Sequence, residues 1–195
     1  MRIIIGITGA SGAIFGIRTL EALQTLGVES HLILSRWSRA TIASETSYSI
    51  SQVEQLASFF HNQENQAAPV SSGSFRTDGM IVVPCSMKTL AAIRHGYGES
   101  LIARAADVVL KERRKLVLLV RESPFSEIHL ENMLALTRMG AVIFPPVPAF
   151  YNQPQSVEDI VRHIVGRLLD QFGLEMPGLR RWSGFEMNRK NEPNC

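Results

Sequence analysis

Short runs of β-branched and other apolar residues alternate with stretches of helical period along the whole chain. Five runs are typical of buried strands: Ile3–Ile7, Ser30–Leu34, Met80–Val83, Leu116–Val120 and Ala141–Phe144. Strands of a parallel sheet are near-continuously apolar because helices cover both faces of the sheet. The alternation therefore predicts an α/β fold of three layers, α/β/α, built on a doubly wound parallel sheet.

Seven segments between and after these runs fit amphipathic helices: Ala13–Leu26, Trp37–Thr46, Ser51–Phe59, Met87–Arg94, Leu101–Glu112, Ser126–Arg138 and Val157–Phe172. A chain of 195 residues is the size of one domain. We expect that domain to span residues 1–185, followed by a polar tail at 186–195. The polar, turn-rich connection 62–78 is long for a compact domain, and a short edge strand is expected near Ala67–Ser71.

Composition and charge exclude several classes of protein. No apolar run approaches the ~18 residues of a membrane span, so no membrane segment is expected. A net charge of +2 does not favour nucleic acid as a partner. The two cysteines, Cys85 and Cys195, cannot make a disulfide framework, which favours a reducing, cytoplasmic location. The apolar N-terminal run superficially resembles a signal peptide, but its glycines and Thr8 suit a strand better.

The first predicted strand leads into a glycine-rich loop, Gly6-Ile-Thr-Gly9-Ala-Ser11-Gly12. Glycines allow a sharp turn and let backbone N–H groups approach a phosphate at a helix N-terminus. The spacing is GxxGxxG, which differs from the GxGxxG of dinucleotide sites. The loop favours a phosphate-bearing ligand, and a tight turn that binds nothing is the alternative.

The end of the second strand bears on which nucleotide could bind. NAD sites carry Asp or Glu there, to bind the ribose hydroxyls. This chain has Ser35-Arg36-Trp37-Ser38 instead, which disfavours NAD. Two ligands stay open: NADP, with its 2′-phosphate on Arg36, or a mononucleotide whose polar chain meets Ser35. Ser35 is also suited to cap the next helix.

The third and fourth strands also end in polar residues. Pro84-Cys85-Ser86-Met87-Lys88-Thr89 brings hydroxyls to a helix start, and Arg121-Glu122 brings two opposite charges. Ligands of α/β sheets bind at the carboxyl ends of the strands, so both segments are candidates for binding, with Glu122 as a proton acceptor. Helix capping and an Arg121–Glu122 ion pair are the structural alternatives. Cys85 has no obvious His partner and is interpreted as a buried thiol.

The last candidates follow the fifth strand. The proline-rich connection 144–154 carries Tyr151, and Arg167 lies on the next helix, off its apolar face. Arg167 is either a solvated surface residue or a residue that faces a neighbouring subunit. The chain has sixteen Arg against four Lys, an excess that suits phosphate contacts and subunit interfaces.

Taken together, these segments resemble a known family, the UbiX-type flavin prenyltransferases. The resemblance runs in order from Met1 to about Trp182 and is closest to the branch long called phenylacrylic acid decarboxylases or hydroxyarylic acid decarboxylases. The segments that carry it are Gly9-Ala-Ser11-Gly12, Pro84-Cys-Ser-Met-Lys-Thr89, Arg104-Ala-Ala-Asp107, Arg121-Glu122-Ser-Pro, Ile128-His-Leu-Glu-Asn-Met-Leu-Ala-Leu136 and Pro148-Ala-Phe-Tyr-Asn-Gln-Pro154. Peptidyl-cysteine decarboxylases share Pro-x-Ser-x-x-Thr but have Asn where this chain has Lys88, which weakens that interpretation.

The resemblance implies a Rossmann-like or flavodoxin-like sheet of about six parallel strands and a homododecamer. It implies metal-independent transfer of a dimethylallyl group from dimethylallyl phosphate to N5 and C6 of reduced FMN. The prenylated FMN would pass to a UbiD-type decarboxylase, which carries out the decarboxylation. Two alternatives stay open: direct FMN-dependent decarboxylation of aromatic or phenylacrylic acids, and a non-catalytic flavin carrier.

The resemblance also implies roles for particular residues. The residues implied to bind FMN are Gly9, Ala10, Ser11, Ser35, Ser86, Met87, Lys88, Thr89 and Arg121. Those implied to surround the substrate phosphate are Arg104, Lys111, Arg121, Tyr151 and Arg167. Those implied to act in catalysis are Glu122, Ser11, Glu45 and Trp182, with Trp182 as an aromatic wall for the allyl cation; no metal ligand is implied. Packing does not oblige Tyr151 and Arg167 to face their own subunit's flavin, so we expect a site shared between subunits.

Overall fold

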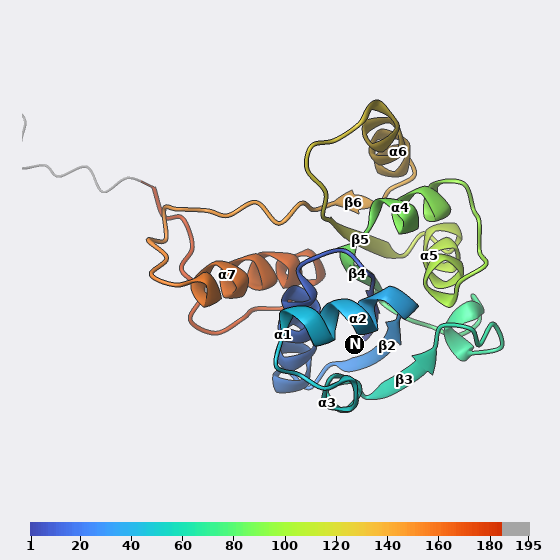
Figure 1. Cartoon of the computed structure of the whole chain (residues 1–195), viewed down its shortest axis with the longest axis horizontal. Coiled ribbons are helices and arrows are strands. Elements are labelled where there is room, and N and C mark those ends of the chain that lie inside the picture. Colours follow the sequence, from blue (N-terminus) through green and yellow to red (C-terminus); the bar gives the residue numbers. More distant parts are fainter. Residues whose placement is uncertain (185–195) are drawn as a thin grey trace, which may run out of the picture.

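The computed structural model describes residues 1–184, and its six strands form one parallel sheet (Figure 1). The order across the sheet is β3-β2-β1-β4-β5-β6. The strands are β1 (Arg2–Ile7), β2 (Glu29–Leu34), β3 (Phe59–Asn62), β4 (Gly79–Cys85), β5 (Lys115–Val120) and β6 (Val142–Ile143). The doubly wound parallel sheet is confirmed, and all five strands predicted from apolar runs are present. The expected tail, 186–195, lies outside the described residues.

Helices cover both faces of the sheet. One face carries α1 (Ala13–Thr25), α2 (Arg36–Glu45), α3 (Ile50–Gln55) and α7 (Val157–Leu169), and the other carries α4 (Met87–Arg94), α5 (Leu101–Lys111) and α6 (Glu127–Arg138). β1 contributes to both cores, because alternate side chains of a strand point to opposite faces. Ile3 and Ile5 lie in the first core and Ile4 in the second, each at most 1% exposed.

The edge strand β3 corrects two expectations from the sequence. Phe59 begins this strand and does not end a helix, and residues 69–71 form a short 3-10 helix where an edge strand was expected. β3 pairs with β2, so that His31 lies opposite Phe59, and the ring nitrogens of His31 and His61 lie 2.8 Å apart. A strand of only four residues, stabilised by residues far away in the sequence, has too short a hydrophobic pattern to be predicted from the sequence.

Two features of the fold determine where a ligand can bind. The sheet is wound in both directions from β1, with β2 on one side and β4 on the other, so a crevice is expected at their carboxyl ends. After β6, residues 144–156 run as an extended arm away from the sheet to the start of α7 (Figure 1). Within residues 1–184, no helix is long and apolar enough to cross a bilayer.

Candidate active site

The loops after four strands carry most of the predicted flavin-binding residues along the carboxyl edge of the sheet. Gly9–Ser11 follow β1, Ser35 follows β2, Ser86–Thr89 follow β4, and Arg121 and Glu122 follow β5. The order of the strands brings these segments to one edge, around the point where the winding direction of the sheet reverses.

The loop between β1 and α1 depends on its glycines. Gly12 has φ +100°, a left-handed conformation that residues with a side chain seldom adopt. A Cβ added at Gly9 would lie 2.4 Å from Cβ of Trp37, so the loop packs directly against the start of α2. The Thr41 hydroxyl donates to the Gly9 carbonyl over 3.3 Å, which continues this contact along α2. The loop is therefore shaped by α2 as well as by its own sequence.

A carboxylate from α2 occupies the N-terminus of α1. Glu45 Oε2 accepts hydrogen bonds from the backbone N–H groups of Gly12 (2.8 Å) and Ala13 (3.2 Å). Burial raises the pKa of Glu45, but hydrogen bonds from Ser11, Gly12 and Ala13 and the charge of Arg121 outweigh it and lower the pKa. The sequence favours a ligand's phosphate at the start of α1, whereas in the structure Glu45 supplies the anion there from within the chain.

Thr8, which no motif of the sequence marks, joins the loop after β1 to the loop after β4. Its buried hydroxyl donates to the Pro84 carbonyl (2.7 Å) and accepts from the Ser86 N–H (2.9 Å). Ser86 in turn caps α4, because its Oγ accepts from the Thr89 N–H (3.3 Å). A hydroxyl at the end of an apolar strand was the only sequence signal for Thr8.

The charged groups of this edge are largely available to a ligand. Among residues 1–184, the side chains of Lys88 and Arg121 make no hydrogen bond or salt bridge, and both residues are exposed. The expected alternative, an Arg121–Glu122 ion pair, does not form; Glu122 Oε1 accepts from the Ser123 N–H instead (3.1 Å). Burial raises the pKa of the Cys85 thiol to about 12, which keeps it protonated and unsuited to nucleophilic attack.

A second group of predicted residues surrounds a cavity of about 550 Å³ between the arm and α7. Tyr151 comes from the arm, Arg167 from α7 and Trp182 from the segment after α7, and all three line the cavity. Tyr151 and Trp182 meet edge to face with ring centroids 5.5 Å apart. The Tyr151 hydroxyl lies 2.9 Å from Nε2 of the buried His163.

Asp170 and Arg181, which the sequence analysis also missed, belong to this cavity region. Asp170 Oδ2 accepts from Arg167 (2.7 Å), and both oxygens of Asp170 accept from Arg181 (2.8 and 2.7 Å). Hydrogen bonding from Arg181, above all, lowers the pKa of Asp170 despite its partial burial, so Asp170 is ionised. The spacing of His163, Arg167 and Asp170, four residues and then three, could have indicated a shared helix face.

The predicted phosphate-binding residues of α5 form a third group. Arg104 pairs with Asp107 (2.8 Å) and donates to the Ser71 carbonyl (3.2 Å). Lys111 pairs with its neighbour Glu112. Because α5 runs antiparallel to the strands and ends shortly before β5 begins, Lys111 lies at the amino edge, opposite the glycine-rich loop. Within the described part of one chain, no hydrogen bond or ion pair joins the three groups.

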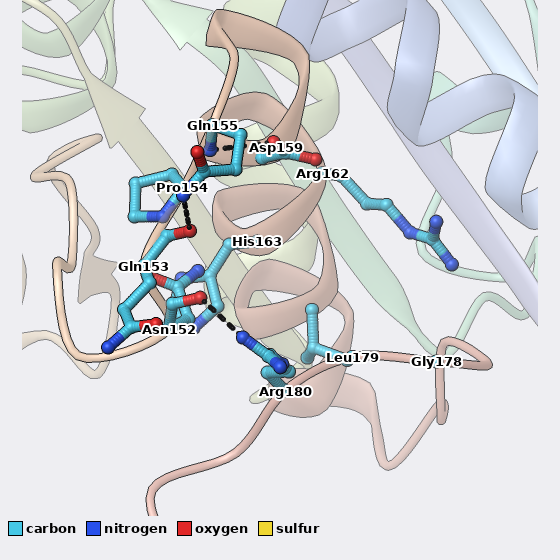
Figure 2. A pocket seen from close by; sticks show the side chains of 10 residues that line it. All are labelled: Asn152, Gln153, Pro154, Gln155, Asp159, Arg162, His163, Gly178, Leu179 and Arg180. Carbon is cyan, nitrogen blue, oxygen red and sulfur yellow. Dashed lines mark hydrogen bonds between the residues drawn. The ribbon is translucent and has the colours of Figure 1, made fainter.

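A smaller cavity of about 260 Å³ adjoins the second group (Figure 2). Arg180 reaches back to the Asn152 carbonyl (3.2 Å), while Arg162 points away and donates to the Pro177 carbonyl (2.7 Å). His163 lines both cavities. Within residues 1–184, no group of three or more His, Cys, Asp and Glu side chains is arranged to hold a metal ion.

Comparison with known proteins identifies close relatives. The Flavoprotein family model matches residues 1–169. A "probable UbiX-like flavin prenyltransferase" of Streptomyces sp. (strain D7) is 63% identical over 190 residues, which cover 97% of this chain and 95% of the relative.

Two solved structures share the fold over nearly their whole length. One is a dodecameric FMN-dependent UbiX-like decarboxylase from Escherichia coli O157:H7, with a TM-score of 0.93 and 62% identity over 94% of this chain and 100% of that one. The other is AnUbiX (PadA1) in complex with FMN and dimethylallyl pyrophosphate, with a TM-score of 0.94 and 60% identity over 95% of this chain and 98% of that one.

Proposed function

The chain belongs to the UbiX-like flavin prenyltransferases of the Flavoprotein family, and from this membership we infer the reaction that it catalyses. It transfers a dimethylallyl group from dimethylallyl phosphate to N5 and C6 of reduced FMN. The observation that carries this conclusion is 63% identity to a UbiX-like flavin prenyltransferase over 97% of the chain. The complex of a relative 60% identical to this chain with FMN and a dimethylallyl donor supports the same substrates.

The residues of the carboxyl edge fit FMN. When bound, FMN supplies the nitrogen and carbon that accept the prenyl group. The N–H groups of Met87 and Lys88 begin α4 and have no intrahelical partner, so they suit a phosphate, with the Lys88 ammonium and the Ser35 hydroxyl as further ligands. Because Glu45 already occupies the start of α1, we assign the flavin phosphate to α4 and the Gly9–Ser11 loop to the flavin ring.

Proton transfer is assigned to Glu122 and Ser11, with Glu45 holding Ser11. Glu122 lies half-buried at the carboxyl end of β5 with no cation paired to it among residues 1–184. An unpaired carboxylate at the ligand edge can accept a proton as the new bond to the flavin matures. Glu45, kept ionised by its hydrogen bonds, fixes the Ser11 hydroxyl and the loop around it.

Departure of the substrate phosphate requires cations, because negative charge develops on the leaving group. Arg167 and Tyr151 lie at the cavity beside the arm, whereas Arg104 and Lys111 lie on α5. We assign all four, with Arg121, to one phosphate site completed by neighbouring copies of the chain, as in a homododecamer. The dodecameric state of the relative from Escherichia coli supports that assembly.

A mixing experiment tests the shared site. Arg167→Ala subunits and Glu122→Gln subunits, each inactive alone, should regain part of the activity when mixed, because some sites then receive both intact residues. Native mass spectrometry establishes that subunits have exchanged. Exchange without recovered activity would place Arg167 in the site of its own subunit.

The reaction itself is tested by mass spectrometry of the flavin. Protein, reduced FMN and dimethylallyl phosphate are incubated without oxygen, and the flavin should gain the mass of one prenyl unit. Release of carbon dioxide from an aromatic acid by this protein alone would favour a decarboxylase, and unchanged bound FMN would favour a flavin carrier.

We further propose that a UbiD-type decarboxylase receives the product and that the protein works in the cytoplasm. The cytoplasmic location is supported by the cysteine content, since Cys85 is buried and free. Adding the reaction mixture to a UbiD-type decarboxylase that lacks its cofactor should restore decarboxylation, and unmodified FMN should not.

A further inference from the structure

A line of polar residues runs along one face of α7 and continues into the residue that caps its C-terminus. His163, Arg167 and Asp170 are spaced by four residues and then three, so they lie one above another on the helix. The segment after α7 folds back along this face and brings Arg181 against Asp170. The result is a cluster of two guanidinium groups around one carboxylate at the end of the larger cavity.

The burial of these groups shows which way the cluster faces. The Asp170 side chain is 16% exposed, whereas those of Arg167 and Arg181 are 48% and 43% exposed. The carboxylate therefore lies beneath and the two arginines lie above it, lining the cavity. Asp170 balances one of the two cations. The other carboxylate nearby, Glu175, lies 4.0 Å from Arg181 and is 88% exposed, so water screens its charge and the buried side of the cluster stays positive towards the cavity.

We propose that Arg181 is a second arginine ligand of the prenyl donor's phosphate, and that Asp170 is the positioning residue that holds Arg167 and Arg181 side by side. The inference rests on the proposed function and extends it to two residues outside the motifs of the sequence. Two fixed guanidinium groups match the oxygens of a phosphate, and their remaining N–H groups are still available to donate. The apolar side chains of Phe144, Val147 and Ile164 line the rest of the cavity, as suits a hydrocarbon tail.

The first test compares two adjacent arginines in the FMN-loaded oligomer. Arg181→Gln should raise the KM for dimethylallyl phosphate about tenfold or more, the usual effect of losing a hydrogen bond between charged groups. Arg180→Gln is the matched control, because Arg180 lines the smaller cavity and donates to the Asn152 carbonyl. Its KM should stay within about twofold of the wild-type value.

The second test separates positioning from general structural damage. Asp170→Asn removes the charge that aligns the arginines and should also raise the KM for dimethylallyl phosphate several-fold, while the Kd for FMN and the oligomer size stay unchanged. Asp170→Glu keeps the charge and should recover most of the lost affinity. Equal KM values for wild type, Arg181→Gln and Asp170→Asn would overturn the proposal, as would an equal effect of Arg180→Gln.

Binding of inorganic phosphate provides a readout that does not depend on turnover. Calorimetry on the FMN-loaded oligomer should show weaker phosphate binding in Arg181→Gln and Asp170→Asn than in Arg180→Gln. If both substitutions weaken phosphate binding but the wild type does not prenylate FMN, the proposed function is wrong and the phosphate site stands. If the wild type prenylates FMN but neither substitution weakens phosphate binding, only the phosphate site is wrong.

Discussion

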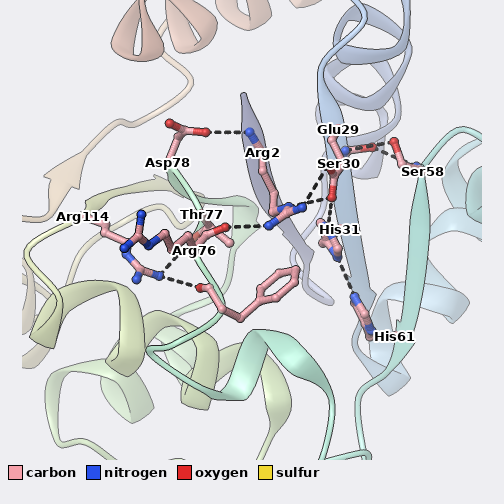
Figure 3. A network of polar contacts seen from close by, with 11 residues as sticks. Arg2, Glu29, Ser30, His31, Ser58, His61, Arg76, Thr77, Asp78 and Arg114 are labelled. Carbon is pink, nitrogen blue, oxygen red and sulfur yellow. Dashed lines mark hydrogen bonds and ion pairs between the residues drawn. The ribbon is translucent and has the colours of Figure 1, made fainter.

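The two edges of the sheet hold their polar side chains in opposite ways. At the amino edge, Arg2 Nε donates to Glu29 (2.6 Å), and the Arg2 backbone N–H donates to Asp78 (2.6 Å) (Figure 3). At the carboxyl edge, Lys88 and Arg121 have no such side-chain partner within residues 1–184. Arg2, Glu29 and Asp78 are thus paired within the chain, whereas Lys88 and Arg121 stay available to a ligand.

The amino-edge network reaches across three strands and the connection before β4. His31 is buried between Glu29 and His61, with 2.8 Å on each side (Figure 3). Arg114 donates to the carbonyls of Gly73 (2.7 Å) and Phe75 (2.9 Å), which holds the second half of the long connection 62–78 in place. Polar groups satisfied in this way stabilise a fold, whereas charges without partners at a sheet's ligand edge indicate function.

The largest expected effect is at the carboxyl edge. Glu122→Gln should leave FMN bound and slow formation of prenylated flavin by ~10²-fold or more, the range typical of general acid–base groups. Single-turnover absorbance spectra measure the rate, with Glu127→Gln as a control at an exposed position on α6. An unchanged rate would reduce Glu122 to a structural role.

A second substitution at the same edge should affect binding but not stability. Arg121→Gln should weaken FMN binding by about tenfold or more, because a charged donor to the ligand is lost. The free energy of unfolding without FMN should change by less than about 0.5 kcal/mol, since this guanidinium supports no salt bridge among residues 1–184. Fluorescence titration and urea denaturation give the two values. Arg36→Gln is the control, and a larger effect from it would favour NADP over FMN.

The amino edge should respond in the opposite way. Glu29→Gln should lower the free energy of unfolding by about 1 kcal/mol, because solvent screens the half-exposed pair with Arg2, and leave the kcat of the folded enzyme unchanged. Hydrogen bonds from Arg2 and then His31 hold the pKa of Glu29 below its usual range, so the substitution removes a true carboxylate. Urea denaturation measures the loss, with the exposed Glu131→Gln as control. A Glu29→Gln variant with unchanged stability and a lower kcat would contradict the view that the amino edge serves stability and the carboxyl edge serves function.

The smallest effect concerns pH. Burial, and then the charge of His31, lowers the pKa of His61 below its ordinary value of about 6.5. The folded chain therefore binds fewer protons here than the unfolded chain, and stability is lost as pH falls from about 6.5 towards the folded pKa. His61→Gln should reduce this loss, because glutamine does not titrate. Urea denaturation at two pH values tests it, and an unchanged pH slope would contradict it.

The sequence predicted the parts of this molecule that depend on local pattern. The apolar runs of β1, β2, β4 and β5 are buried on both faces, so their sequence alone distinguishes them. The sequence also placed Ser35 and Ser86 at the ends of their strands, because topology brings all carboxyl ends to one edge. Both serines cap helices, which is compatible with binding a ligand.

The parts that the sequence missed depend on contacts between distant segments. β3 owes its place to His31, about thirty residues away, and Arg181 meets Asp170 only because the chain folds back along α7. Tyr151 and Arg167 were found through resemblance, but a single chain does not bring them to Gly9–Ser11. The hydrophobic period or residue spacing of one chain does not reveal which residues contact a second copy of the chain.

The two hydrogen bonds of Thr8 have a consequence for anyone who re-engineers this protein. Its one hydroxyl bonds to both Pro84 and Ser86, so the loops after β1 and β4 are held together. Grafting either loop alone onto another scaffold would leave a buried donor or acceptor stranded and distort the graft. The transferable module is the pair of loops together with Thr8, although nearly eighty residues separate them along the chain.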